Sequence, residues 1–310
     1  MSALICGSFA YDNIMLFDGR FKDHILPDKV HMLNVAFLVP DLRREFGGCA
    51  GNIAYNLKLL GGEGHAMGTV GSDFKPYAEW MDEKGISRDF LREIDTTYTA
   101  QAYITTDKDD NQITAFHPGA MNESHQNEVP ADKGISIGII APDGRQGMIE
   151  HATQFADADI PFIFDPGQGL PMFDGEALTD FINKATWVAV NDYESQMLSD
   201  RTGLSPADIA KRVESLIVTR GAEGSVVYTE GKRIDIPAVK AEELRDPTGC
   251  GDAYRAGLLF GLMNDFDLET TGRIASLMGS IKIAHNGTQN HMFTAAEFAD
   301  RFEKEFGYRF

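Results

Sequence analysis

The sequence predicts an α/β protein with a mostly parallel central sheet and a smaller β-sheet lid. Short apolar runs, each bounded by turn residues or by a polar stretch, alternate with stretches of helical periodicity. Continuous apolar strands of this kind are typical of a parallel sheet covered by helices on both faces. A hairpin pattern interrupts the alternation and predicts the second sheet.

The central sheet is expected to contain five apolar runs, and helices are expected between them. The expected strands are residues 4–7, 135–141, 162–164, 187–190 and 216–219. The expected helices are residues 50–60, 75–84, 145–156, 172–184 and 205–214, followed by 251–264, 268–286 and 294–306 in the last third of the chain.

Two further stretches predict the lid. Residues 98–117 form two alternating runs around a polar turn at 107–112, and residues 30–39 form another strand-like run. We expect 12–39 and 98–117 to form the lid, and 1–11, 40–97 and 118–310 to form one large α/β domain. The apolar lid residues Met32, Phe37 and Phe116 suit either a flat substrate group or the lid's own core. An exposed edge strand could pair with a second copy, so a homodimer through the lid is left open.

The charge balance excludes several partners. The chain has 28 Lys and Arg against 47 Asp and Glu, a net charge of -19. Such a surface repels nucleic acid and anionic membranes, so neither is an expected partner.

Three widely spaced cysteines predict reduced thiols rather than a disulfide framework. With no signal-like segment and no apolar run of membrane-spanning length, a cytoplasmic location is expected.

The segment Asp246-Pro-Thr-Gly-Cys-Gly-Asp252 has the composition of a phosphate site. Gly249 and Gly251 allow a tight turn, and a helix follows directly, so that free N–H groups can bind a phosphate. Asp252 in the first helical turn could accept the proton of an attacking hydroxyl. The alternative is a loop-to-helix junction in which Asp252 only balances the helix dipole.

Three other segments are weaker candidates. Gly47 and Gly48 allow close approach to a ligand and Asn52 can bond a hydroxyl, although a glycine turn before a helix explains them equally well. Asn191 and Glu194 could organise hydrated Mg²⁺ or form a capping box. Asp12 would suit the diol of a sugar. The glycines of the segment 218–224 could pass close to a nucleotide or form a plain turn.

In this order and spacing the segments resemble the ribokinase (PfkB) family of carbohydrate and nucleoside kinases, over nearly the whole chain. The resemblance implies a ribokinase-like three-layer domain, ATP and Mg²⁺, and it leaves a dependence on K⁺ open. It also implies that Asp252 is the catalytic base. The backbone N–H groups of Gly249, Cys250 and Gly251 would form an anion hole. Cys250 departs from the family's usual Ala, but only its N–H is needed.

The same resemblance implies roles for the other segments. The expected nucleotide-binding residues are Asn191, Thr219, Gly221, Gly224 and Asn286. Asn191 and Glu194 would hold the metal through water. The expected substrate-binding residues are Asp12, Asn13, Gly47, Gly48, Asn52 and Phe116.

Within the family, the segments are most similar to adenosine kinases and broad nucleoside kinases. That similarity implies transfer of the ATP γ-phosphate to a ribose 5′-hydroxyl, and a ribose- or fructose-type sugar acceptor is the alternative. Rival classes lack their motifs: the sequence has no G-x-G-x-x-G after its first strand, no P-loop and no HExxH. A non-enzymatic nucleotide sensor would not require Asp252, Asn191 and Glu194 together.

Overall fold

The computed structural model describes residues 1–25, 34–109, 111–229 and 231–310. A nine-stranded sheet forms the centre of the molecule. In the strand order given next, all neighbouring strands between β11 and β5 pair parallel. In order across the sheet, the strands are β13 (Lys232–Ile236), β12 (Ser225–Thr229), β11 (Ser215–Thr219), β10 (Trp187–Asn191), β9 (Phe162–Phe164), β8 (Ile135–Ile140), β1 (Ser2–Cys6), β4 (Glu63–Gly71) and β5 (Ser87–Ile94). The predicted α/β fold with a mostly parallel sheet is therefore confirmed.

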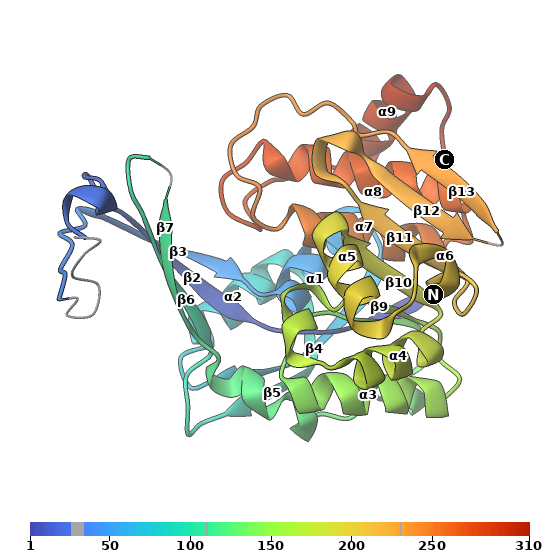
Figure 1. The fold of residues 1–310 in the computed structure, drawn as a ribbon, viewed down its shortest axis with the longest axis horizontal. Coiled ribbons are helices and arrows are strands. Elements are labelled where there is room, and N and C mark those ends of the chain that lie inside the picture. The colour runs from blue at the N-terminus through green and yellow to red at the C-terminus, as the bar shows by residue number, and fades with distance from the viewer. Residues whose placement is uncertain (26–33, 110, 230) are drawn as a thin grey trace.

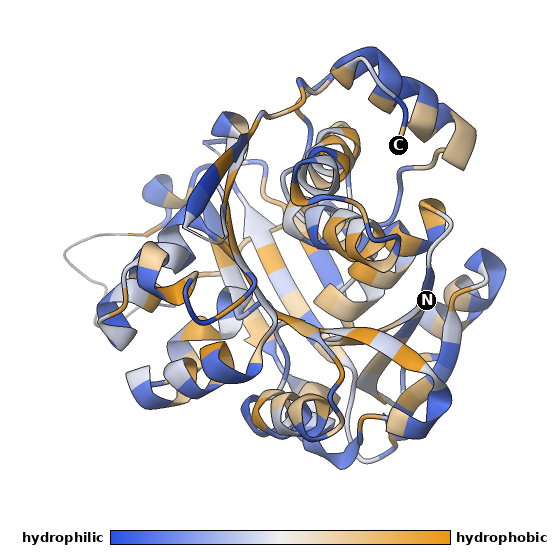
Figure 2. Ribbon diagram, turned by 90° about the vertical axis from the view of Figure 1, so that its right-hand side faces the viewer, coloured by the Kyte–Doolittle hydropathy of each residue, from blue (hydrophilic) through white to orange (hydrophobic). Residues whose placement is uncertain are grey.

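The central sheet is buried on both faces. Along β1, Ala3 and Ile5 pack into one apolar cluster, while Leu4 and Cys6 pack into another on the opposite face. This is the alternation that strand geometry imposes. Figure 2 shows the apolar strands at the centre with helices around them.

Helices cover the two faces of the sheet as separate layers (Figure 1). Helices α3 (Arg145–Asp157), α4 (Gly175–Lys184) and α5 (Asp192–Thr202) cover one face, and α1 (Cys49–Leu59), α2 (Lys75–Lys84), α7 (Cys250–Met263) and α8 (Leu268–Ile283) cover the other. Helix α9 (Ala295–Phe306) packs outside α8, and α6 (Pro206–Ile209) is a single turn. Among the described residues, no helix combines the length and apolarity that crossing a bilayer needs.

A second, four-stranded sheet projects from the main body (Figure 1). Its strands are β3 (Asp41–Gly47), β2 (Ala10–Leu16), β6 (Ala100–Thr106) and β7 (Gln112–His117), in that order. The hairpin predicted within 98–117 is confirmed, because β6 and β7 pair antiparallel. This sheet also takes strand β3 from residues that we expected to belong to the large domain.

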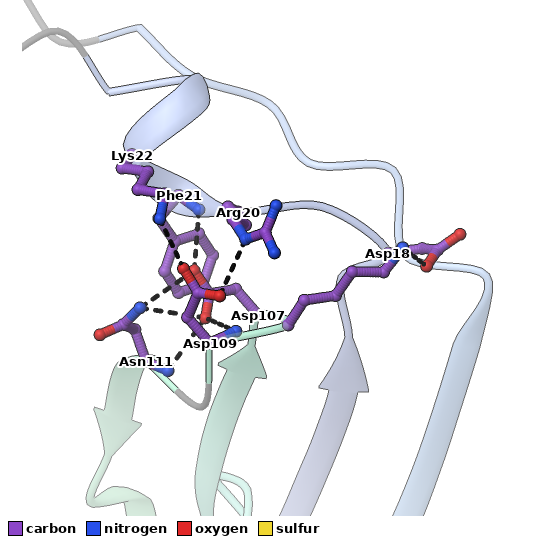
Figure 3. Close-up of polar contacts among 8 residues, drawn as sticks. Asp18, Arg20, Phe21, Lys22, Asp107, Asp109 and Asn111 are labelled. Carbon is purple, nitrogen blue, oxygen red and sulfur yellow. Dashed lines mark hydrogen bonds and ion pairs between the residues drawn. The ribbon is translucent and has the colours of Figure 1, made fainter.

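The far end of the small sheet is held together by two aspartates from the hairpin turn (Figure 3). The Asp107 carboxylate accepts hydrogen bonds from the backbone N–H groups of Phe21 and Asn111, at 2.8 and 2.9 Å. Asp109 pairs with Arg20 and Lys22 at 2.8 and 2.9 Å. These contacts tie the hairpin to the segment that follows β2.

Several element boundaries differ from the sequence prediction. No strand forms at 34–39, while residues 30–33, with Met32, lie outside the described residues. Phe37 packs against Phe17 and Phe21, so its ring belongs to the lid core. The helix predicted at 205–214 ends at Ile209. The helix predicted from 172 begins at Gly175, where Asp174 caps it.

Candidate active site

A tight glycine turn forms at the start of α7, in the segment predicted to bind phosphate. Gly249 is the residue before the helix and has φ 78°, a conformation that favours glycine. A Cβ on Gly249 would lie 2.9 Å from the Thr288 side chain, so the loop after α8 closes against this turn. The first N–H groups of a helix have no partner within it. The Cys250 N–H donates to the Pro247 carbonyl oxygen at 3.2 Å and so closes the turn on itself. Gly249 and Gly251 place backbone donors where an anion can bind.

Asp252 lies in the first turn of α7, and its carboxylate faces α1. Its Oδ2 accepts a hydrogen bond from Asn52 Nδ2 at 2.8 Å. Burial raises the pKa of Asp252 to about 6, and the nearby Asp165 carboxylate adds to the increase. Arg255 and the Asn52 bond oppose it. The carboxylate is thus the main form above about pH 6, with a pKa close to that of an efficient general base.

Asn52 is oriented by a residue that the sequence did not single out. Gln289 Nε2 donates to Asn52 Oδ1 at 3.0 Å and to the Tyr77 hydroxyl at 2.6 Å. Trp80 Nε1 in turn donates to Gln289 Oε1 at 3.0 Å. With its oxygen engaged by Gln289, the Asn52 amide presents its NH₂ group to Asp252. In this arrangement Asn52 bonds the expected base rather than pointing freely into the site.

A buried ion pair lies behind Asp252. Arg255, one turn further along α7, donates to both carboxylate oxygens of Asp165 at 3.1 Å. The two residues are only 4% and 5% exposed. Asp165 follows β9, and its charge also acts on Glu194. The charges of the pair therefore act on both the expected base and the expected metal-organising residue.

Asp12 and Phe116 share one face of the small sheet. The strand register places Glu45, Asp12, Ala102 and Phe116 in a single row across β3, β2, β6 and β7. Residues directly opposite one another in a sheet project to the same side. Burial, with the charges of Asp246 and Glu45, raises the pKa of Asp12 to about 6, so this face is turned toward the loop before α7. Phe116 is 52% exposed on the same face.

Asn13 is not brought together with Asp12. Adjacent residues of a strand point to opposite faces, and the Asn13 amide bonds Gln101 and Arg44 on the other side. Gly47 lies against Asp12, since a Cβ there would be 2.6 Å from the carboxylate.

Four of the five expected nucleotide-binding residues lie at or just after the carboxyl ends of two neighbouring strands. Asn191 ends β10 and is paired in register with Thr219 at the end of β11. Gly221 and Gly224 follow directly and have positive φ. Asn286 is exposed in the loop after α8. Ligands of open α/β sheets bind at this edge.

The capping-box interpretation of Asn191 and Glu194 is confirmed. Asn191 Oδ1 accepts from the Glu194 N–H, and Glu194 Oε2 accepts from the Asn191 N–H, both at 2.7 Å. In the described part of the chain, no group of three or more His, Cys, Asp or Glu side chains could hold a metal ion. The side-chain oxygens of Asn191 and Glu194 would therefore fit a Mg²⁺ ion that is held mainly through waters and phosphate oxygens, as Mg²⁺ usually is.

Gly48 directly precedes α1, at the junction of the two sheets. Substituting it tests how closely the backbone segments pack there. Its φ is 88°, and a Cβ would lie 2.5 Å from the Ser8 carbonyl oxygen. Gly61 has φ 83° with nothing within 4 Å of that position. We expect Gly61→Ala to cost about 1–2 kcal/mol of unfolding free energy from its φ alone. Gly48→Ala should cost a further ~1–3 kcal/mol, because the added methyl overpacks the junction and because φ 88° with ψ 140° is a backbone conformation that only glycine readily adopts.

Chemical denaturation of both variants measures this difference directly. Equal losses for Gly48→Ala and Gly61→Ala would show that neither close packing nor the ψ of 140° adds to the requirement for glycine at position 48.

These features define a ribokinase-like small-molecule kinase: a mostly parallel α/β domain, a small sheet over its edge, and a glycine turn followed by an acid at a helix start. The pattern of the pfkB family carbohydrate kinases matches residues 13–295. The chain belongs to this family.

The relatives and solved structures agree with this assignment. A nucleoside kinase from Methanocaldococcus jannaschii is 35% identical over 274 residues, covering 87% of this chain and 90% of the relative. The structure of a Burkholderia thailandensis nucleoside kinase in complex with inosine has 55% identity and a TM-score of 0.90, with 99% of each chain covered. The structure of the M. jannaschii enzyme has 32% identity and a TM-score of 0.89, with 98% of each chain covered.

Proposed function

We propose that this kinase transfers the γ-phosphate of ATP to the ribose 5′-hydroxyl of adenosine or a related nucleoside. The observation that carries the proposal is the row on the small sheet that places the Asp12 carboxylate and the exposed Phe116 ring on one face. A carboxylate suits a ribose diol, and an aromatic ring suits a flat base. The similar enzymes from M. jannaschii and B. thailandensis, both nucleoside kinases, support the same acceptor class.

In the proposed mechanism, each part of the site has one task. Asp252 accepts the proton of the 5′-hydroxyl as that oxygen attacks phosphorus. The N–H groups of residues 249–251 stabilise the negative charge on the transferred phosphoryl group. Mg²⁺, when bound, would neutralise phosphate charge, and Asn191 and Glu194 would hold it through water. Closure of the small sheet over the substrate would exclude water and limit ATP hydrolysis.

A phosphorylation screen tests the acceptor. With ATP and Mg²⁺, we expect adenosine and inosine to exceed ribose and fructose 6-phosphate in kcat/KM by at least about tenfold, the scale of one apolar contact. Guanosine and cytidine would rank the preference among bases. A preference for ribose or fructose 6-phosphate would instead establish a sugar kinase of the same family.

Two variants of β7 sharpen the screen. Phe116→Ala should lower kcat/KM for nucleosides and leave the value for ribose unchanged. Ile113→Ala is the matched control, because Ile113 is similarly exposed but projects from the other face of the same strand. If Phe116→Ala affects nucleosides and ribose equally, the ring does not contact the base.

A further inference from the structure

A fully buried lysine lies beside the proposed anion hole. Lys282, in the last turn of α8, is 0% exposed. Lysine is almost never fully buried unless it is paired. Here the ammonium donates to two backbone carbonyl oxygens, that of Asp246 at 2.7 Å and that of His285 at 3.2 Å. A buried charge held by main-chain oxygens next to a candidate active site calls for an explanation.

The Lys282 bonds join the two loops that build the turn before α7. Asp246 begins the segment that leads to Gly249, and its carboxylate accepts from the backbone N–H groups of Thr248 and Gly287, both at 2.9 Å. His285 lies in the loop after α8. The lysine therefore fixes the backbone immediately before residues 249–251, and it does so from the protein interior.

Two converging carbonyl oxygens are also the kind of ligand that proteins offer to K⁺. In this chain the ammonium of Lys282, which carries a single positive charge as K⁺ does, lies between the two oxygens and donates to both. Burial lowers the pKa of Lys282 below its ordinary value, and the nearby Asp246, Cys250 and Asp252 partly offset this decrease. Hydrogen bonds to carbonyl acceptors favour the charged form as well.

We propose that Lys282 is a positioning residue that serves as the built-in cation of the anion hole. It holds the 246–249 loop in place and contributes a fixed positive charge near the transferred phosphoryl group, in place of a free monovalent cation. The proposal rests on the anion-hole role of residues 249–251. If Lys282 has this role, the enzyme should not depend on added K⁺.

Removing the charge tests the proposal. Lys282→Met keeps most of the side-chain volume, and we expect it to lower kcat by about 10²-fold, the usual scale for losing one preorganised electrostatic group. The KM for the nucleoside should change little, since Asp12 and Phe116 are untouched. Lys304→Met, on the exposed surface of α9, is the matched control and should behave like the wild type.

Chemical rescue separates a charge effect from a purely structural one. In Lys282→Ala, which leaves space in the site, NH₄⁺, methylammonium or K⁺ should restore part of the lost kcat, and choline at equal ionic strength should not. Wild-type kcat should be the same in choline and in K⁺ buffers. This last measurement stands even if a Lys282 variant fails to fold.

Three results would overturn the proposal: full activity of Lys282→Met, loss of activity that no cation restores, or a wild-type enzyme that requires added K⁺. An active wild type with a fully active Lys282→Met would refute only the lysine's role. A wild type that phosphorylates none of the acceptors would refute the proposed function itself.

Discussion

Replacing Asp252 by Asn is expected to lower kcat by about 10²–10⁴-fold, the contribution of a positioned general base. The amide keeps the size of the side chain and an oxygen that can accept from Asn52, but it cannot take a proton at neutral pH. Nucleoside and ATP should still bind, because the residues expected to contact them are unchanged. Steady-state kinetics and calorimetric titration of each ligand measure the two effects separately.

The matched control is Glu176→Gln, the same acid-to-amide change in the first turn of α4 on the other side of the sheet. It should leave kcat unchanged. Asp252→Asn should also fold normally. The folded-state pKa of Asp252 lies above its unfolded value, so its ionised form destabilises the protein as pH rises from about 4 to 6. An Asp252→Asn enzyme with kcat close to that of the wild type would show that another group accepts the proton.

The parts of the site that lie within one segment could be predicted from the sequence. The Gly249–Asp252 turn and the Asn191–Glu194 capping box depend on residues a few positions apart, and the chain's local conformation brings them together. The partners of those residues could not be found in this way. Gln289 orients Asn52 across 237 positions, and no local pattern distinguishes it from any other polar loop residue.

The same limit applies to the fold. Strands with uninterrupted apolar runs, such as β9, were predicted because their burial on both faces is visible in their composition. Strand β4 was missed because glycines interrupt it. Gly68 is needed there, since a Cβ would lie 2.7 Å from the Gly7 carbonyl oxygen of the neighbouring strand segment. The interior charges Lys282, Asp165 and Arg255 were missed because each looks like a surface residue until its tertiary partner is known.

Removing the Arg255 side chain is expected to lower the stability of the protein strongly. Arg255→Met would leave the Asp165 carboxylate buried without a partner, and such a loss costs about 3–5 kcal/mol of unfolding free energy. The double variant Arg255→Met with Asp165→Leu should regain most of it, because neither charge then remains. Denaturant unfolding of the two single variants and the double variant gives the coupling free energy of the pair.

The Arg255 substitution should also change the chemistry one turn away. Arg255 lowers the pKa of Asp252 and Asp165 raises it. In Arg255→Met the acid limb of kcat/KM should therefore move to higher pH, and in the double variant it should move back toward the wild type. The surface counterpart is Arg88→Met, which removes an equally bidentate but exposed pair with Asp82 and should alter neither stability nor the pH profile appreciably. If Arg255→Met is no less stable than Arg88→Met, the buried pair of Arg255 and Asp165 does not stabilise the folded protein.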